Sequence, residues 1–355
     1  MKKKTRLLIL FGGRSSEHEV SLRSTAAICQ NLRPERYQTS LVYIDRRGRW
    51  FRQKAGAAAF KNKALNPRPD PRGAVSLPLG KRGDAALGSI DVVFPILHGP
   101  YGEDGTLQGL LELLGLPYVG CGVLASAACM DKEATKRLAE QAGLPVLPYI
   151  VAGAGTKVSA GKVEKKLGWP VFVKPARQGS SVGVSRVAAP RGLKDACRHA
   201  FRFDDKILIE KGLTARELEC AVLGGGSKAK ASCLGEIIPS REFYTYAAKY
   251  LDPEGARLVY PVDLGEKKTA EARGLALAAF KALDCHGMAR VDMLQDKKTG
   301  RLYLNELNTI PGFTAISMYP KLWEVSGVSF PKLLDRLIDL ALLRHRQKSK
   351  LKTSL

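Results

Sequence analysis

Runs of apolar residues that end at glycine or proline predict the first elements of the chain. Leu7–Phe11 and Asp91–Leu97 are dominated by apolar residues and lead into glycine-containing loops, as buried parallel strands do. Leu41–Ile44 predicts a third strand, and Ser21–Leu32, followed by Pro34, predicts a helix. Because strands and helices alternate, we expect an open parallel α/β domain here.

Beyond residue 120, strands follow one another with fewer helices between them, which predicts an α+β arrangement. The predicted strands are 171–174, 183–187, 207–210, 217–223, 232–238, 288–294 and 301–307, and the predicted helices are 131–141, 269–283 and 330–343. We therefore divide the chain into domains 1–120, 121–211 and 212–346, with a proline-rich surface insertion at 53–90 and a basic tail at 347–355.

Composition is that of an ordinary globular protein. The 355 residues are 45% hydrophobic and 26% charged, and no apolar run approaches the roughly 18 residues that span a bilayer. Met1–Phe11 is similar to a secretion signal, but its short apolar stretch meets Gly12 and Gly13 without a cleavage site, so we expect a strand. Seven cysteines without a CxxC pair indicate neither disulfides nor zinc, and favour the cytoplasm.

The net charge of +23 is the one extreme value, and it raises the alternative of a nucleic-acid-binding protein. Residues 1–10, 53–90 and 344–355 together carry more than half of this excess. Charge at the ends of a chain and in a proline-rich stretch is typical of a solvated surface. No pattern of stacking aromatic residues accompanies it. We therefore expect no nucleic-acid partner.

Two polar pairs on neighbouring predicted strands could hold a metal ion. Arg290 and Asp292 are two residues apart, as are Glu306 and Asn308, so each pair lies on one face of its strand. Carboxylate and amide oxygens are ligands that suit Mg²⁺ rather than zinc. The alternative is a sheet that faces solvent with ordinary surface charges.

A glycine- and serine-rich loop follows a predicted buried strand that ends in a lysine. Lys174 precedes the loop Gln178–Gly183, whose backbone N–H groups could hold phosphate oxygens, although the Walker sequence is absent. The alternative is a flexible hairpin loop. Gly120–Ala125 matches the dinucleotide pattern G-x-G-x-x-A, but the acidic residue expected after the next strand is missing.

Two further loops follow predicted parallel strands, where ligands of α/β sheets gather. Glu17, in the loop 12–19, could pair with a substrate ammonium, or it could simply be an acidic residue at a helix N-terminus. His98 begins the loop 98–105, which is rich in glycine and acidic residues and could equally be an ordinary turn.

Taken together, these stretches resemble the D-alanine–D-alanine ligases, enzymes of the ATP-grasp fold. The similar stretches occur in the family's order and are GGRSSEHEVSLRS (12–24), LHGPYGEDGTLQGLLELLGLPYVG (97–120), MDK (130–132), VKPARQGSSVGVS (173–185), IEK (209–211), AAKY (247–250), ARVDM (289–293) and NELNTIPGFTAISMYPKL (305–322). The resemblance implies ATP-dependent ligation of two D-alanines through a D-alanyl phosphate, for peptidoglycan synthesis.

The resemblance also implies the residues that bind ATP and metal. ATP would lie between the central domain and the C-terminal domain, with two Mg²⁺ ions, for which Mn²⁺ can substitute, and with room for a monovalent cation. The implied ATP-binding residues are Lys132, Lys174, Gly179, Ser180, Ser181, Val182, Glu210, Lys211, Leu213 and Glu217. The implied metal ligands are Asp292, Glu306 and Asn308.

Further residues correspond to those that contact the amino-acid substrates in the family. Glu17, Ser180 and Tyr250 would link to close the site, and Arg290 with the N–H of Gly312 would bind the oxyanion. The implied substrate-binding residues are Glu17, His98, Lys249, Ser317 and Met318. The family is usually dimeric, so we expect a homodimer.

The resemblance says less about which second substrate accepts the D-alanyl group. Tyr250 favours the dipeptide, because family members that make the D-lactate ester usually have histidine there. Thr245 and Ala247 stand where relatives usually have acidic residues, so the charge partners of that loop differ. A D-alanine–D-lactate or D-alanine–D-serine ligase remains the alternative within the fold.

Overall fold

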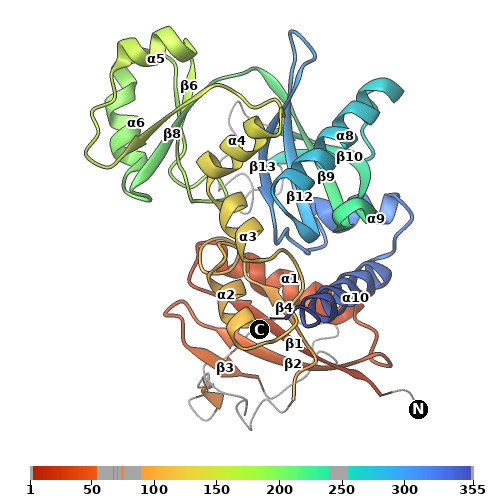
Figure 1. Ribbon diagram of the computed structural model, residues 1–355. Helices are drawn as coiled ribbons and strands as arrows, with labels where there is room; N and C mark the ends of the chain where they lie inside the picture. The colour runs from red at the N-terminus through yellow and green to blue at the C-terminus, as the bar shows by residue number, and fades with distance from the viewer. Residues whose placement is uncertain are drawn as a thin grey trace.

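The computed structural model describes residues 3–53, 67, 70, 73–75, 89–239 and 255–352. These residues form three β-sheets with helices packed on them, which is the predicted mixture of α/β and α+β structure (Figure 1). Most of the predicted insertion 53–90 lies outside the described residues, as do Lys249 and Tyr250. Within the described residues, no helix combines the length and the apolar character that crossing a membrane requires.

The first sheet has the strand order β3-β2-β1-β4, with β1 parallel to both β2 and β4. Alternate residues of β1 point to opposite faces: Leu7, Ile9 and Phe11 pack under α1, whereas Leu8 and Leu10 pack under α2. Burial on both faces explains the continuous apolar run in the sequence. The elements are β1 (Thr5–Gly12), α1 (His18–Asn31), β2 (Tyr37–Ile44), β3 (Trp50–Arg52), β4 (Val92–Ile96) and α2 (Thr106–Leu113).

Two consecutive helices lead to the second sheet, which is antiparallel throughout and has the order β5-β8-β6-β7. Val171 and Val173 of β6 face a core formed with α5 and α6, so the alternate residue Lys174 faces away from that core. The elements are α3 (Val123–Met130), α4 (Lys132–Gln141), β5 (Tyr149–Gly153), α5 (Ala160–Leu167), β6 (Val171–Pro175), β7 (Ser185–Val187), α6 (Leu193–Ala200) and β8 (Lys206–Lys211).

The third sheet is also antiparallel and has the order β11-β10-β9-β12-β13. Ala289, Val291 and Met293 of β12 pack with α8, which turns Arg290 and Asp292 to the opposite face. The elements are β9 (Ala215–Gly225), β10 (Lys230–Pro239), β11 (Ala256–Val259), α8 (Glu266–Ala282), β12 (His286–Asp296), β13 (Leu302–Asn308) and α9 (Met318–Val325).

Helix α10 (Phe330–Lys348) returns to the first sheet and packs beside α1 and β4 (Figure 1). Its buried residues, among them Leu334 and Ile338, share one core with Leu7 and Phe94. The Tyr37 hydroxyl donates a hydrogen bond of 2.6 Å to Asp335 of this helix. The first sheet therefore depends on residues more than 200 positions further along the chain.

Helix α10 also extends beyond the predicted end at residue 343. Arg344 donates hydrogen bonds to the carbonyl oxygens of Gly120, at 2.5 Å, and Tyr118, at 3.0 Å. Its guanidinium lies 4.4 Å from the centre of the Tyr118 ring, and Lys348 pairs with Glu112 at 2.5 Å. Part of the basic C-terminal segment thus binds the first domain, contrary to the expectation of a solvated surface.

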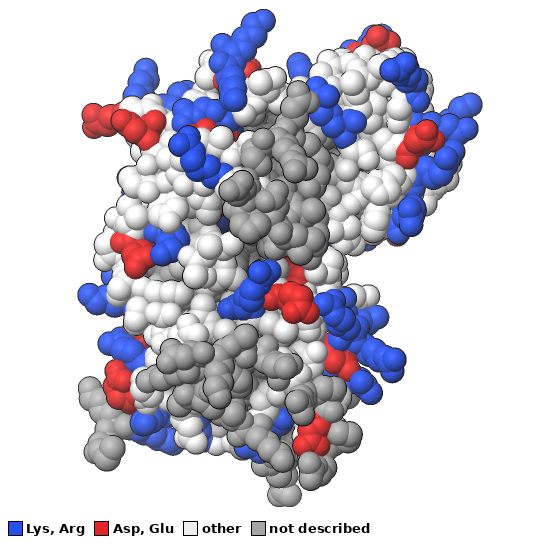
Figure 2. Space-filling model, turned by 180° about the vertical axis from the view of Figure 1, so that it is seen from behind, with Lys and Arg blue, Asp and Glu red and all other residues white. Residues whose placement is uncertain are grey.

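On the face in Figure 2, Lys and Arg side chains are spread over the whole height of the molecule with Asp and Glu among them. All seven cysteines are free, as expected.

Candidate active site

A cavity of about 480 Å³ lies where the three sheets meet. Residues from separate predicted motifs come together in its wall: Glu17, His98, Lys132, Gly179, Ser180, Arg290, Glu306, Asn308, Gly312, Ser317 and Met318. These residues span some 300 positions of sequence, so only the tertiary fold brings them together.

Arg290 and Asp292 share one face of β12, as the spacing predicts. Arg290 donates two parallel hydrogen bonds to Asp292, Nε to Oδ1 at 2.7 Å and Nη2 to Oδ2 at 2.6 Å. Strand register places Asn308 opposite Arg290 and Glu306 opposite Asp292, and Asn308 Nδ2 donates to Asp292 Oδ2 at 3.0 Å. The four polar side chains therefore form one cluster on the sheet face that lies away from α8.

Glu219 is a member of this cluster that the sequence analysis did not identify. It lies on β9 opposite Asp292, its side chain is 5% exposed, and its Oε1 is 3.0 Å from Arg290 Nε. Burial by itself lowers the pKa of Arg290, but Asp292 and Glu219 raise it well above its usual value. Glu217 lies two residues earlier on the same strand, and alternate residues of a strand share one face. This spacing could have identified Glu219 as a site residue once Glu217 had been assigned.

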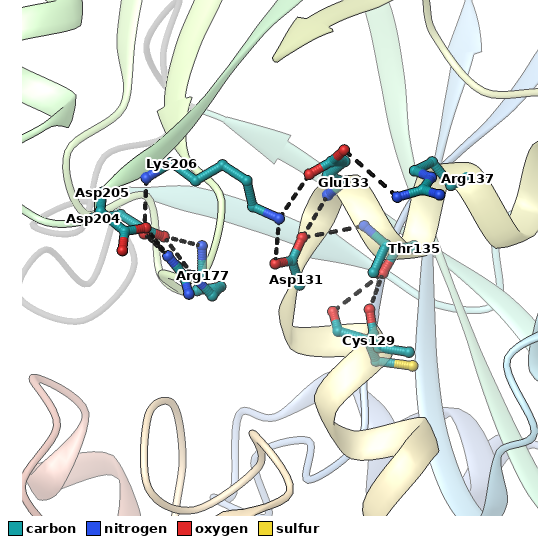
Figure 3. Close-up of polar contacts among 11 residues, drawn as sticks. Cys129, Asp131, Glu133, Thr135, Arg137, Arg177, Asp204, Asp205 and Lys206 are labelled. Carbon is teal, nitrogen blue, oxygen red and sulfur yellow. Dashed lines mark hydrogen bonds and ion pairs between the residues drawn. The ribbon is translucent and has the colours of Figure 1, made fainter. Parts of the chain in front are cut away.

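Lys132 approaches the cluster from the start of α4. Its Nζ lies 3.5 Å from Glu306 Oε2 and donates to the carbonyl of Gln178 at 2.6 Å. Asp131 fixes this position by accepting hydrogen bonds from the N–H groups of residues 133 and 134, a helix N-cap. Lys206 of β8 binds both Asp131 and Glu133, which ties the helix to the second sheet (Figure 3).

The glycine- and serine-rich loop reaches across the cavity to the first domain. Ser180 Oγ donates to Glu17 Oε1 at 2.6 Å. Ser180 and Ser181 have φ values of 51° and 59°, in the left-handed region that costs free energy for residues other than glycine. At the base of the loop, Arg177 pairs with Asp204 and Asp205 (Figure 3). The loop is therefore held at its base by Arg177 and in its middle by Ser180.

His98 is buried and hydrogen-bonded between two segments. Its Nδ1 lies 2.8 Å from the carbonyl oxygen of Ile310, and its Nε2 lies 3.2 Å from Ser24 Oγ. Burial lowers the pKa of His98, which favours the neutral ring. Glu103, in the same loop, also lines the cavity, and burial followed by the negative charge of Glu17 raises its pKa well above the usual range. No role was predicted for Glu103 from the sequence.

The remaining predicted ATP-binding residues do not line this cavity. Lys174 of β6 and Glu210 of β8 form an ion pair of 2.5 Å on the face of the second sheet that lies away from α5 and α6. Ser181 and Val182 lie in the loop after β6. Lys211 ends β8, Leu213 follows it, and Glu217 lies on β9.

Comparisons with known proteins match nearly the whole chain to one family. The family models described as D-ala D-ala ligase N-terminus and D-ala D-ala ligase C-terminus match residues 6–121 and 138–339. A D-alanine–D-alanine ligase of Thermoanaerobacter sp. (strain X514) is 48% identical, with 97% of this chain and 98% of the relative covered. D-alanine–D-alanine ligase A of Escherichia coli (strain K12) is 43% identical, with 99% and 100% covered.

The chain belongs to the D-alanine–D-alanine ligase family. Solved structures agree with this assignment. The D-alanine–D-alanine ligase of Coxiella burnetii superposes with a TM-score of 0.85 at 40% identity, covering 98% of this chain and 96% of that one. The VanG D-Ala:D-Ser ligase of Enterococcus faecalis superposes equally well, with a TM-score of 0.85 at 33% identity, covering 96% and 100%.

Membership of the family confirms the predicted ATP-grasp fold and the predicted class of ATP-dependent ligase. The nucleic-acid-binding alternative has no support, because its only basis was the net charge. The individual residue roles remain predictions.

Proposed function

We propose that this protein joins two D-alanines to D-alanyl-D-alanine, with conversion of ATP to ADP and phosphate, for peptidoglycan precursor synthesis. The observation that carries the proposal is that one cavity is lined both by the Glu17–Ser180 contact and by Arg290, Glu306 and Asn308, which form a cluster with Asp292. In such a cavity Glu17 can bind an ammonium group and Arg290 can stabilise a developing oxyanion. The carboxylate and amide oxygens can bind a metal ion that accompanies phosphates.

In the first step, the carboxylate of one D-alanine attacks the γ-phosphate of ATP and forms an acyl phosphate. Glu17 binds the ammonium of that D-alanine, and neutral His98 lies beside it. Lys132, Lys174 and the backbone of residues 179–182 offset the negative charge of the phosphates, which would otherwise repel the attacking carboxylate. Glu210, Lys211 and Leu213 contact the adenine, and Glu217 contacts the ribose.

The oxygen-rich cluster fits Mg²⁺. Asp292 and Glu306 lie opposite each other across the strands and Asn308 contacts Asp292, so two carboxylates and one amide are available. In the described parts of the chain, no three His, Cys, Asp or Glu side chains are arranged as a metal site. When bound, Mg²⁺ neutralises charge on the transferring phosphoryl group.

In the second step, the amine of the second D-alanine attacks the acyl phosphate. The developing oxyanion accepts hydrogen bonds from Arg290 and from the N–H of Gly312, and phosphate leaves. Ser317, Lys249 and Met318 bind the second D-alanine. The Ser180 loop excludes water, which would otherwise hydrolyse the acyl phosphate.

A D-serine acceptor is the second candidate, and one observation favours it. The VanG D-Ala:D-Ser ligase is as similar in structure as the Coxiella burnetii ligase. Against this, the higher-identity relatives in sequence are named D-alanine–D-alanine ligases. Acceptor competition distinguishes the two candidates.

The experiment that tests the proposal measures phosphate release from ATP and Mg²⁺ while D-alanine is added, with L-alanine as the control. We expect release that depends on D-alanine and is matched by dipeptide formation. D-Serine and D-lactate are then added as competing acceptors. Release with neither alanine isomer, from folded protein, would contradict the D-alanine assignment.

Two statements about context belong to the same proposal. We place the enzyme in the cytoplasm, where its substrate ATP is made. We also propose a homodimer, supported by the exposed apolar side chains Leu113 (84%) and Leu124 (66%) on the adjacent helices α2 and α3. Sedimentation of the wild type beside Leu124→Glu tests the dimer.

A further inference from the structure

Lys136 is a fully buried lysine that the proposed mechanism does not use. It lies one turn after Lys132 on α4, and its side chain is 1% exposed. A buried ammonium group is rare unless it is paired, because leaving water is costly for a charge. Its position beside the proposed nucleotide site therefore calls for an explanation.

The partner of Lys136 is Glu210. Lys136 Nζ forms an ion pair with Glu210 Oε1, and neither atom has another hydrogen-bond partner among the described residues. The other oxygen of Glu210, Oε2, pairs with Lys174 Nζ at 2.5 Å. The carboxylate thus lies between two lysines, one oxygen to each.

The two lysines differ in their surroundings. Lys136 is enclosed, with its Nζ 5.4 Å from the centre of the Tyr149 ring, whereas the Lys174 side chain is 11% exposed. Burial by itself raises the pKa of Glu210, but Lys174 and Lys136 lower it to about 2. Burial lowers the pKa of Lys136, and the negative charge of Glu210 opposes that shift. With both lysines protonated, the cluster of one carboxylate and two ammonium groups carries one excess positive charge.

We propose that Lys136 is the permanent counter-ion of Glu210, and that it frees Lys174 to move from Glu210 to a phosphate of the bound nucleotide. The inference rests on the proposed ATP-dependent function. Without Lys136, movement of Lys174 would leave a buried carboxylate unpaired, which is strongly unfavourable. With Lys136 present, Glu210 keeps one partner before and after the phosphate binds.

Lys136 is accordingly a positioning residue for phosphate binding. Its replacement should change the affinity only for ligands that carry phosphate. Lys136→Met removes the charge while keeping a long apolar side chain. We expect it to weaken ADP binding relative to adenosine binding by about tenfold, the size of a coupling between contacting charged groups. Competition with a fluorescent ADP analogue measures both affinities.

A second variant separates this role from a structural one. In Lys136→Met/Glu210→Gln no buried carboxylate is left unpaired, so the ADP-to-adenosine ratio should return to within about twofold of the wild type even though adenine contacts weaken. Lys166→Met, an exposed lysine on α5, is the control for loss of one charge. Thermal unfolding of each variant reports folding separately.

The outcomes are distinct. Equal loss of ADP and adenosine binding in Lys136→Met, or no loss of ADP binding, would overturn the proposal. A ratio that stays low in the double variant would also overturn it. Because these measurements use no amino-acid substrate, they stand even if D-alanine proves to be the wrong substrate. A wild type that binds no ADP would contradict both this inference and the proposed function.

Discussion

Ser180 Oγ donates a hydrogen bond of 2.6 Å to Glu17 Oε1, although 163 residues separate the two in the chain. The bond joins a loop of the second sheet to a loop of the first sheet, over the cavity whose wall contains both residues. In the proposed function the Glu17 carboxylate binds the substrate ammonium group, so this contact between two domains would couple closure of the loop to the bound substrate.

Ser180→Ala should loosen this closure. We expect the KM for D-alanine to rise about tenfold, the worth of one hydrogen bond to a charged group, and phosphate release to exceed dipeptide formation because water enters. Parallel assays of phosphate and dipeptide give the ratio. Ser185→Ala, on β7 outside the cavity, is the control. A ratio of one phosphate per dipeptide in Ser180→Ala would argue against a role in excluding water.

Glu306→Gln should reduce kcat by about 10²–10³-fold, because it removes a charge from the proposed metal ligands. Its side chain lies at the cavity wall, 28% exposed, so the midpoint of thermal unfolding should change little. Glu324→Gln, on the outside of α9, is the control and should keep wild-type turnover. Normal turnover of Glu306→Gln would rule out the metal assignment.

Arg344→Met should destabilise the protein without affecting chemistry. It removes two hydrogen bonds from a charged donor and a contact with the Tyr118 ring, which together contribute about 2 kcal/mol or more. Urea unfolding measures the loss. Deletion of residues 349–355 is the comparison and should leave both stability and activity nearly unchanged. A large loss of activity on that deletion would show that the extreme tail is functional.

His286 should make the protein sensitive to acid. Burial, and then the positive charge of Arg344, lower the pKa of His286 to about 4. As the pH falls from about 6.5 to 4, the unfolded chain takes up a proton that the folded protein does not, so the free energy of unfolding decreases by up to about 1.4 kcal/mol per pH unit.

The pH dependence of unfolding is compared in two variants, His286→Gln and the control His199→Gln. His199 is the control because it is exposed on α6. Unfolding free energies from pH 7 to pH 4 should show a smaller slope in His286→Gln than in the wild type and in His199→Gln. Identical slopes in all three proteins would contradict the assignment to His286.

Tyr250 lies outside the described residues, so its prediction rests on the sequence alone. Tyr250→His should shift part of the activity from D-alanine to D-lactate as the acceptor, because histidine is usual in relatives that form the ester. Competition between the two acceptors, with both products quantified, measures the shift. An unchanged product ratio would show that this position does not choose the acceptor.

Local pattern was enough to predict much of the site. Period-two alternation placed Arg290 and Asp292 on one face and Glu306 and Asn308 on one face, and strand register brings the pairs together. A bulge at Asn305 of β13, opposite the step from Asp292 to Met293, lets both Leu304 and Leu307 face the core; it has no such local pattern and was not predicted.

Non-local partners account for what the sequence did not reveal. Lys136 pairs with Glu210, and Glu219 with Arg290, across more than 70 residues in each case. From the sequence alone, a lysine on a helix or a glutamate on a strand cannot be distinguished from an ordinary surface charge, because its partner is distant in the chain. The length of α10 was underestimated for the same reason, because the groups that bind Arg344 and Lys348 belong to the first domain.

The return of α10 to the first sheet also affects how the protein is made. Leu7, Ile9 and Phe94 lie in a core that the helix at 330–348 completes, yet β4 ends at residue 96. At about 5–20 residues per second, a ribosome needs roughly 10–50 s to synthesise the intervening chain. During that time one apolar face of the nascent first sheet has α1 but lacks the part of its cover that α10 supplies. The opening third of the chain therefore cannot finish folding ahead of the rest, and a chaperone that shields it has a defined surface to bind.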